Sequence, residues 1–186
     1  MFEKNIVEFC APTLAGIKTA NLFTCTYGDR SEVVKDVRRY NGLLSKKGVR
    51  ILPVRYSDHR VLIYVFRESF LKKDLCDKET SDILKSFGYE VGNTYACICC
   101  LKRKLESFTD SKYFPHEVGL FLGYPPKDVK GFIENNGECS KCTGCWKVYG
   151  DEKKAKDTFD KYKMCTAEYM KRYSEGVGLD NLVVAM

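Results

Sequence analysis

Two neighbouring runs of strand-forming residues constrain the fold of this chain more than any other feature. Residues 49–56 and 60–67 are rich in Val, Ile, Leu and Tyr, and only Ser57-Asp58-His59 separates them. A connection this short predicts an antiparallel hairpin, because parallel strands need a much longer crossover. Apolar residues occupy both alternating sets of positions in the second run, which predicts a central strand buried on both faces.

Helical patterns on both sides of the hairpin indicate an α+β fold. Residues 2–9 are expected to form one or two helical turns, and Pro12 to open a second helix that ends near Thr19. Ser31 is expected to cap the N-terminus of the next helix. The remaining expected helices are 32–45, 78–87, 94–108, 116–123, 127–135 and 151–173, and the remaining expected strands are 22–27, 146–149 and 180–185. We therefore expect one domain, residues 1–186, with several helices packed on a small mixed sheet of four or five strands that contains the hairpin.

Composition limits the classes of protein to which the chain can belong. Hydrophobic residues make up 44% and charged residues 30% of its 186 residues, which is typical of a globular protein. The net charge of +6 comes from scattered lysines, so it permits contact with nucleic acid or acidic molecules but requires neither. No segment approaches the roughly 18 apolar residues of a membrane helix, and the N-terminus lacks a signal-peptide core. We expect a cytoplasmic protein without a membrane partner.

The chain has ten cysteines, which a reducing compartment would keep as thiols or as metal ligands. Cys139, Cys142 and Cys145 form two successive C-x-x-C steps in a glycine-flanked loop, a spacing that suits an iron–sulfur cluster or zinc. The fourth ligand has to come from elsewhere. Cys165, Cys10 and His116 are candidates, and the predicted metal set includes Cys165. The alternative is a loop of three reduced thiols that face solvent.

A second pattern suggests nucleophilic catalysis by Cys10, with His116 as the base and Glu117 as the group that orients it. A cysteine just before a proline-initiated helix has a lowered pKa, and a nucleophilic thiol needs a base close by. The sequence does not show whether Cys10 and His116 meet in space. The alternative is that Cys10 fills the core.

Residues 116–132 have the apolar spacing of a helix-turn-helix. Gly119 would allow close helix crossing and Gly123 suits the turn, and the expected buried residues are Val118, Leu122, Tyr124, Val129 and Phe132. This pattern suggests a nucleic-acid-binding module, although the second helix lacks the Arg, Asn or Gln side chains that commonly contact bases. The alternative is a helical hairpin that packs on the core.

Arginines in the hairpin give a further candidate binding site. Arg55 and Arg60 could bind an anionic cofactor together with Lys18, because guanidinium groups bind carboxylates and phosphates in a bidentate manner. The alternative, which we favour, is that these arginines pair with acidic neighbours on the surface.

Five stretches together resemble a known family. They are residues 10–18 (CAPTLAGIK), 47–50 (KGVR), 114–125 (FPHEVGLFLGYP), 128–132 (DVKGF) and 146–151 (WKVYGD). The combination resembles the bacterial family catalogued as domain of unknown function 3793, which is found largely in anaerobes, and the resemblance spans nearly the whole chain. It implies a stand-alone cytoplasmic domain and brings no activity, substrate or cofactor with it.

The leading hypothesis from the sequence is a metal- or thiol-dependent protein with a redox or metal-handling role. A cysteine-nucleophile enzyme and a helix-turn-helix protein are the alternatives. A small-molecule or protein partner is compatible with all three, and the sequence names none.

Overall fold

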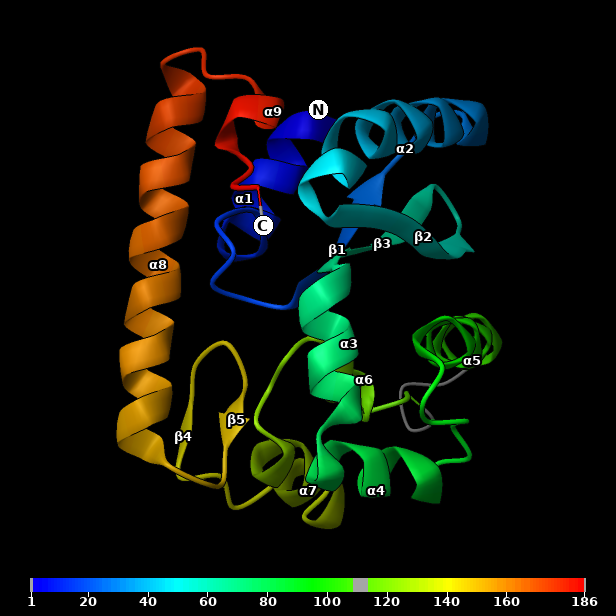
Figure 1. The fold of residues 1–186 in the computed structure, drawn as a ribbon, viewed down its shortest axis with the longest axis vertical. Helices are drawn as coiled ribbons and strands as arrows, with labels where there is room; N and C mark the ends of the chain where they lie inside the picture. The colour runs from blue at the N-terminus through cyan, green and yellow to red at the C-terminus, as the bar shows by residue number, and fades with distance from the viewer. Residues whose placement is uncertain (1, 109–113, 186) are drawn as a thin grey trace. The chain divides into compact units, whose positions relative to one another are not determined.

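The computed structural model describes residues 2–108 and 114–185 and has the predicted mixture of helices and strands (Figure 1). The chain forms two compact units. The first contains residues 1–69 and 162–186, and the second contains residues 70–161. The α+β class is therefore confirmed, while the expectation of one domain stays a prediction.

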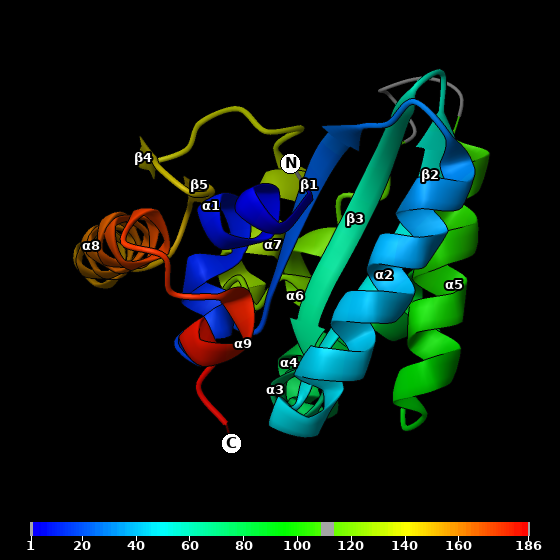
Figure 2. The same ribbon diagram turned by 90° about the horizontal axis from the view of Figure 1, so that it is seen from above.

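The first unit is built on a three-stranded antiparallel sheet in the order β1-β3-β2. Its elements are α1 (Phe2–Leu14), β1 (Ala20–Thr26), α2 (Arg30–Leu44), the short 3₁₀ helix η1 (Ser45–Lys47), β2 (Val49–Ser57), β3 (Arg60–Arg67), the C-terminal part of α8 (Glu152–Ser174) and α9 (Leu179–Leu182). The hairpin and the central position of β3 are confirmed. Val61, Ile63 and Val65 join one core with side chains of α1 and α2, and Figure 2 shows both helices over this face of the sheet. Tyr64 and Phe66 alternate to the other face and are also buried.

The prediction for the N-terminus was wrong, because residues 2–14 form one helix that contains Pro12. Proline removes one helical hydrogen bond, but the apolar face of α1 is fully buried and stabilises the helix through this position. The helix ends where Gly16 adopts a φ of 75°. The amides of Gly16 and Ile17 then donate to the carbonyls of Thr13 and Pro12, which is the pattern of a Schellman motif.

Three further expectations need correction. The cap of α2 is Asp29, whose carboxylate accepts from the Ser31 amide at 2.8 Å, so the helix begins before Ser31. The expected strand at 180–185 is replaced by α9, because the carboxylate of Glu3 accepts from the amide of Leu179 at 3.1 Å and favours a helix start there. The strands also divide into two separate sheets instead of one sheet of four or five.

The second unit is mainly helical. It contains most of α3 (Glu68–Cys76), then α4 (Lys78–Ser86), α5 (Thr94–Ser107), α6 (Val118–Phe121), α7 (Pro126–Glu134), the strands β4 (Cys142–Thr143) and β5 (Lys147–Val148), and the start of α8. Side chains of Asp77 and Asn93 cap α4 and α5. Helix α3 was not expected from the sequence, and the first helix of the expected helix-turn-helix is shorter than predicted, since α6 is a single turn.

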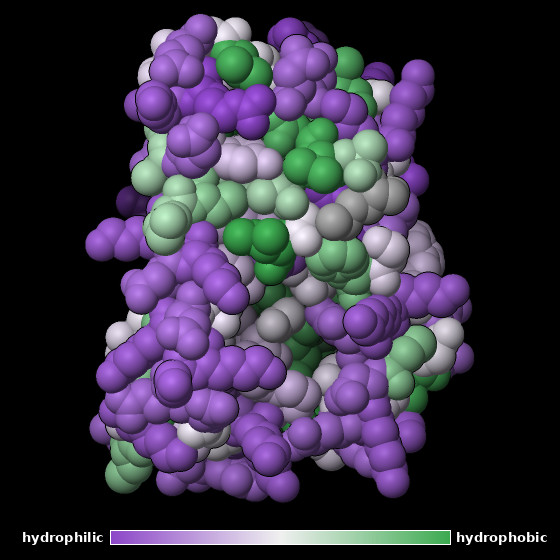
Figure 3. Space-filling model, turned by 60° about the vertical axis from the view of Figure 1, so that its left-hand side comes forward, coloured by the Kyte–Doolittle hydropathy of each residue, from purple (hydrophilic) through white to green (hydrophobic). Residues whose placement is uncertain are grey.

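The surface is mostly hydrophilic on the face drawn in Figure 3, with apolar side chains in small groups. Among the described residues, the exposed large apolar side chains are those of Phe9, Ile17, Val34, Leu43, Tyr95, Met164 and Val184. Within residues 2–108 and 114–185, none of the helices combines the length and the apolar character needed to cross a membrane.

Candidate functional site

The second unit contains a pocket of about 180 Å³ with aromatic walls. Rings from four positions line it together with the imidazole of His116. The complete lining consists of Phe114, His116, Val118, Gly119, Tyr124, Asp128, Val129, Phe132, Trp146 and Lys147. All of these residues lie between 114 and 147, so the segment that includes α6, α7 and β5 forms the pocket.

Close packing of α6 on α7 forms one side of the pocket. A Cβ atom on Gly119 would lie 2.8 Å from Cγ2 of Val129 and 3.2 Å from Cδ2 of Tyr124, so only glycine lets these groups approach as they do. The turn between the helices depends on Gly123, which has a φ of 75°. Pro125 and Pro126 then start α7, where a proline costs no hydrogen bond.

The aromatic rings contact one another around the pocket. The rings of Tyr124 and Trp146 stack with their centroids 4.9 Å apart. On another side, the imidazole of His116 lies 4.9 Å from the ring of Phe132 and 5.5 Å from that of Phe114. Trp146 also meets Phe159 of α8 edge to face at 4.5 Å, which supports the tryptophan from behind.

A buried carboxylate fixes the tryptophan wall. Asp128 is 3% exposed and lies in the first turn of α7. Its Oδ2 accepts from Nε1 of Trp146 at 2.7 Å, and its Oδ1 accepts from the amides of Tyr149 and Gly150 at 2.8 and 2.7 Å. Three donors therefore satisfy this carboxylate, and it links α7 to the β4–β5 hairpin and to the start of α8.

Two polar groups lie at the rim beside the ring of Phe132. Nζ of Lys147 lies 6.0 Å from the centroid of this ring and donates to the carbonyl of Gly137 at 2.6 Å. Partial burial lowers the pKa of His116 below its ordinary value of 6.5, although Glu117 opposes the shift. The imidazole is therefore mainly neutral at pH 7, and it can donate one hydrogen bond and accept another.

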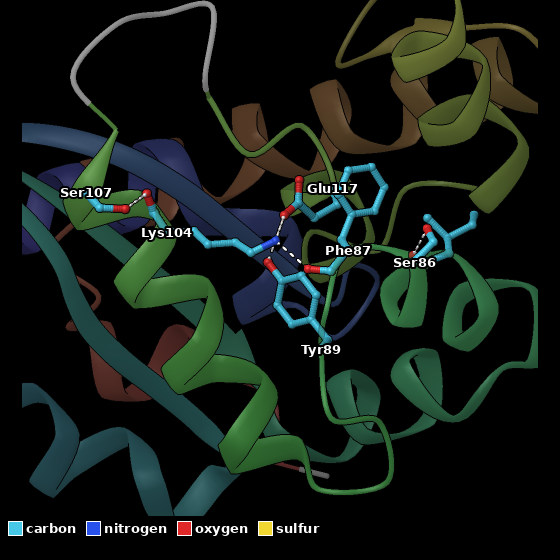
Figure 4. A network of polar contacts seen from close by, with 7 residues as sticks. Ser86, Phe87, Tyr89, Lys104, Ser107 and Glu117 are labelled. Atoms are coloured by element: carbon cyan, nitrogen blue, oxygen red, sulfur yellow. Dashed lines mark hydrogen bonds and ion pairs between the residues drawn. The ribbon is translucent and has the colours of Figure 1, made fainter.

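Glu117 is held by a buried network and not by His116. Figure 4 shows Lys104 extending from α5 toward Glu117, beside Tyr89 and Phe87. Nζ of Lys104 donates to Oε1 of Glu117 and to the carbonyl of Phe87, both at 2.8 Å, and the hydroxyl of Tyr89 donates to the same Oε1 at 3.1 Å. Glu117 is 3% exposed. The network thus anchors the segment that carries His116 next to the pocket.

The structure removes the physical basis for an activated Cys10. The predicted lowering of its pKa required a position before a helix N-terminus, but Cys10 is in the middle of α1 and is fully buried. Burial raises the pKa of this thiol far above its ordinary value, and the charge of Lys18 offsets only part of the effect. Cys10 belongs to the first unit and His116 to the second.

The three predicted metal ligands of the loop lie on the β4–β5 hairpin or just before it. Cys139 has a φ of 59° and is exposed, Cys142 is in β4, and Cys145 is in the exposed turn that leads to Trp146. Cys165 is in the part of α8 that belongs to the first unit, where it packs on the core and burial raises its pKa. Among residues 2–108 and 114–185, no three His, Cys, Asp or Glu side chains form a group that could hold a metal ion.

The proposed anion site is spread over the sheet of the first unit. Thr26 pairs with Arg60 at one end of β1, and Ala20 pairs with Phe66 at the other end, to which Lys18 leads. Six residues of extended chain separate these ends by about 20 Å. Lys18 is 7% exposed, and its Nζ lies over the ring of Tyr162. Arg55 and Arg60 lie on adjacent strands, but Lys18 does not join them.

Of the pocket residues, only His116 was a predicted site residue, and it was predicted for another reason. Val118, Tyr124, Val129 and Phe132 were treated as the core of a helix pair. A usable signal was present, because five ring-bearing residues lie within residues 114–146 beside the only tryptophan of the chain. Spacing alone does not show that these rings surround an empty volume.

The family model described as "Protein of unknown function (DUF3793)" matches residues 6–183. No curated protein and no solved structure matches the chain.

Proposed function

The chain belongs to the DUF3793 family of proteins of unknown function, and we propose that its second unit binds a small molecule that inserts a single planar ring into the aromatic pocket. The observation that supports this most directly is the size of the pocket combined with the nature of its walls. A protein cavity of about 150 Å³ lined by apolar and phenyl side chains is large enough to bind benzene. The pocket here has about 180 Å³, which is enough for one ring.

The aromatic walls of the pocket favour a planar ligand. Offset or edge-on contacts between aromatic rings stabilise a pair by about 0.5–1.5 kcal/mol beyond the area that they bury. Tyr124, Phe132 and Trp146 each present a ring to the pocket. The ring of Trp146 is held by Phe159 and by the carboxylate of Asp128, so its position is already ordered when a ligand binds.

Fluorescence of Trp146 provides the test, since this is the only tryptophan and it lines the pocket. Toluene is the probe, because it offers a single ring without a polar group and absorbs little at the red edge of the indole band. We expect a saturable change in emission with a Kd of about 1 mM, which corresponds to about 0.6 kcal/mol for each of seven non-hydrogen atoms. No saturable change up to the solubility limit of toluene would contradict the proposal.

Two variants on α7 make the test specific. Phe132→Leu removes a ring from the wall and keeps most of the volume, so it should weaken toluene binding about fivefold. Ile133→Leu, at the neighbouring position outside the lining, should leave the Kd unchanged. Equal effects of the two substitutions would place the probe outside the pocket.

The redox or metal-handling role of Cys139, Cys142 and Cys145 stays a prediction that rests on their spacing. Metal analysis of protein purified without oxygen tests it, and iron or zinc at one equivalent or more, lost in Cys142→Ser, is the supporting result. A reducing location such as the cytoplasm, which we also propose, is consistent with ten free cysteines. The alternatives of a cysteine nucleophile and of nucleic-acid binding gain no support from the geometry of Cys10 or of the single-turn α6.

A further inference from the structure

We infer that the ring is carried by an acid, and that the ammonium group of Lys147 binds its carboxylate at the rim of the pocket. This inference rests on the proposed function, because it assigns a chemical class to the ligand of the same pocket. The expected ligand is an aromatic monocarboxylate with a single ring.

The position of Lys147 supports the assignment. The residue is half-buried in β5, and its Nζ lies 6.0 Å from the centroid of Phe132, a ring that forms part of the wall. An ammonium group has three N–H donors. In the described part of the chain, the carbonyl of Gly137 takes up one of them at 2.6 Å. Two donors therefore remain for a ligand, on a cation that is already partly removed from water.

The acidic group of the wall does not offer an equivalent site for a cation. Asp128 is the one carboxylate among the described lining residues. Its Oδ2 is bound by Nε1 of Trp146, and its Oδ1 by the amides of Tyr149 and Gly150. A ligand ammonium would have to compete with these three donors. A ligand carboxylate meets no such competition at Lys147, so the pocket discriminates in favour of anions.

His116 adds a second polar group at the same rim. The centroid of its ring lies 4.9 Å from that of Phe132, the same ring that lies 6.0 Å from Nζ of Lys147. A neutral imidazole keeps one N–H donor, which can serve the second oxygen of a carboxylate. Arrangements with two donors on one carboxylate are stronger and more directional than single contacts.

The experiment compares three probes of the same ring size by the fluorescence of Trp146. Toluene is neutral, benzoate is an anion and benzylamine is a cation. We expect benzoate to bind about tenfold more tightly than toluene, because a charge-assisted hydrogen bond is added, and benzylamine to bind more weakly than toluene. In Lys147→Met the preference for benzoate over toluene should disappear. Lys141→Met is the matched control, since this lysine lies on the same hairpin, outside the lining, and donates to the carbonyl of Gly150.

The outcomes distinguish ring binding by the pocket from carboxylate binding by Lys147. Equal affinities for the three probes, or a preference for benzylamine, would overturn the inference and leave ring binding intact. Failure of all three probes would overturn the proposed function itself. A preference for benzoate that survives in Lys147→Met would refute the assignment of this residue.

Discussion

Asp128→Asn should destabilise the second unit strongly, although it replaces a side chain with one of the same shape. The carboxylate accepts from Nε1 of Trp146 with one oxygen and from the amides of Tyr149 and Gly150 with the other. An asparagine has only one oxygen that accepts. The orientation that keeps both amide bonds turns the NH₂ group toward the indole N–H, so that a donor points at a donor.

The size of the effect follows from the bonds that are lost. Hydrogen bonds to a charged group contribute about 1.5–3 kcal/mol each, and the substitution removes at least one and neutralises the acceptor of the others. The three donors belong to half-buried residues, so water can replace part of the hydrogen bonding that is lost. We therefore expect the free energy of unfolding to fall by about 2–3 kcal/mol. In the native state, emission of Trp146 should shift to the red as its indole N–H loses the buried partner.

Urea unfolding followed by Trp146 fluorescence measures this change, because the only tryptophan lies at the site of the substitution. Asp82→Asn is the control, since Asp82 is 60% exposed and forms a surface ion pair with Lys85. Loss of this ion pair should change the free energy of unfolding by no more than about 0.5 kcal/mol. If Asp128→Asn lowers the free energy of unfolding no more than the control does, or if its native emission is unchanged, then Asp128 does not hold the side chain of Trp146 in place.

Three further predictions concern other buried groups. The side chain of Arg67 is 1% exposed and donates to the carbonyls of Thr13, Leu14, Lys47 and Val184. Arg67→Met should therefore lower the free energy of unfolding, measured in urea, by about 3–5 kcal/mol. A decrease below about 1 kcal/mol would show that these hydrogen bonds do not stabilise the fold. Lys104→Met leaves the carboxylate of Glu117 buried without its cation and should lower the free energy of unfolding by about 2–4 kcal/mol. Adding Glu117→Gln should restore about 1 kcal/mol of this loss. A double variant no more stable than Lys104→Met would contradict an ion pair between Lys104 and Glu117. Because burial raises the pKa of Cys10, its thiolate forms only far above the ordinary pH range, so alkylation at pH 8 mapped by mass spectrometry should label Cys145 at least about a hundredfold faster than Cys10.

Elements whose pattern repeats over many residues could be predicted from the sequence. The hairpin is fixed by two apolar runs and a short turn, and β3 is buried on both faces because both sets of its positions are apolar. The N-terminal helix could not be predicted correctly from Pro12, because the burial of a whole helix face outweighs the local cost of a proline. Residues 180–185 are equally ambiguous, since a short apolar run adopts whichever structure its neighbours stabilise. Here the carboxylate of Glu3, far away in the sequence, receives the first amide of α9.

The candidate site was less accessible to sequence reasoning than the fold. The spacing of Cys139, Cys142 and Cys145 drew attention to ligand chemistry, but spacing does not determine where the sulfur atoms point. A pocket is a volume that side chains leave unfilled, and the sequence indicates which residues are apolar without showing where they fail to meet. His116 was identified because histidines are rare in this chain, although the rings of Phe114 and Phe132 lie beside it and Cys10 belongs to the other unit.

The most direct test of the central claim is the detection of nuclear Overhauser effects between toluene and the isotope-labelled protein. If the ring occupies the pocket, toluene protons should give cross-peaks to the methyl groups of Val129 and Val118 and to the indole of Trp146, all of which line it. Cross-peaks of similar strength to Ile133, which does not line the pocket, or saturable binding without any cross-peak to Val129, would contradict the account.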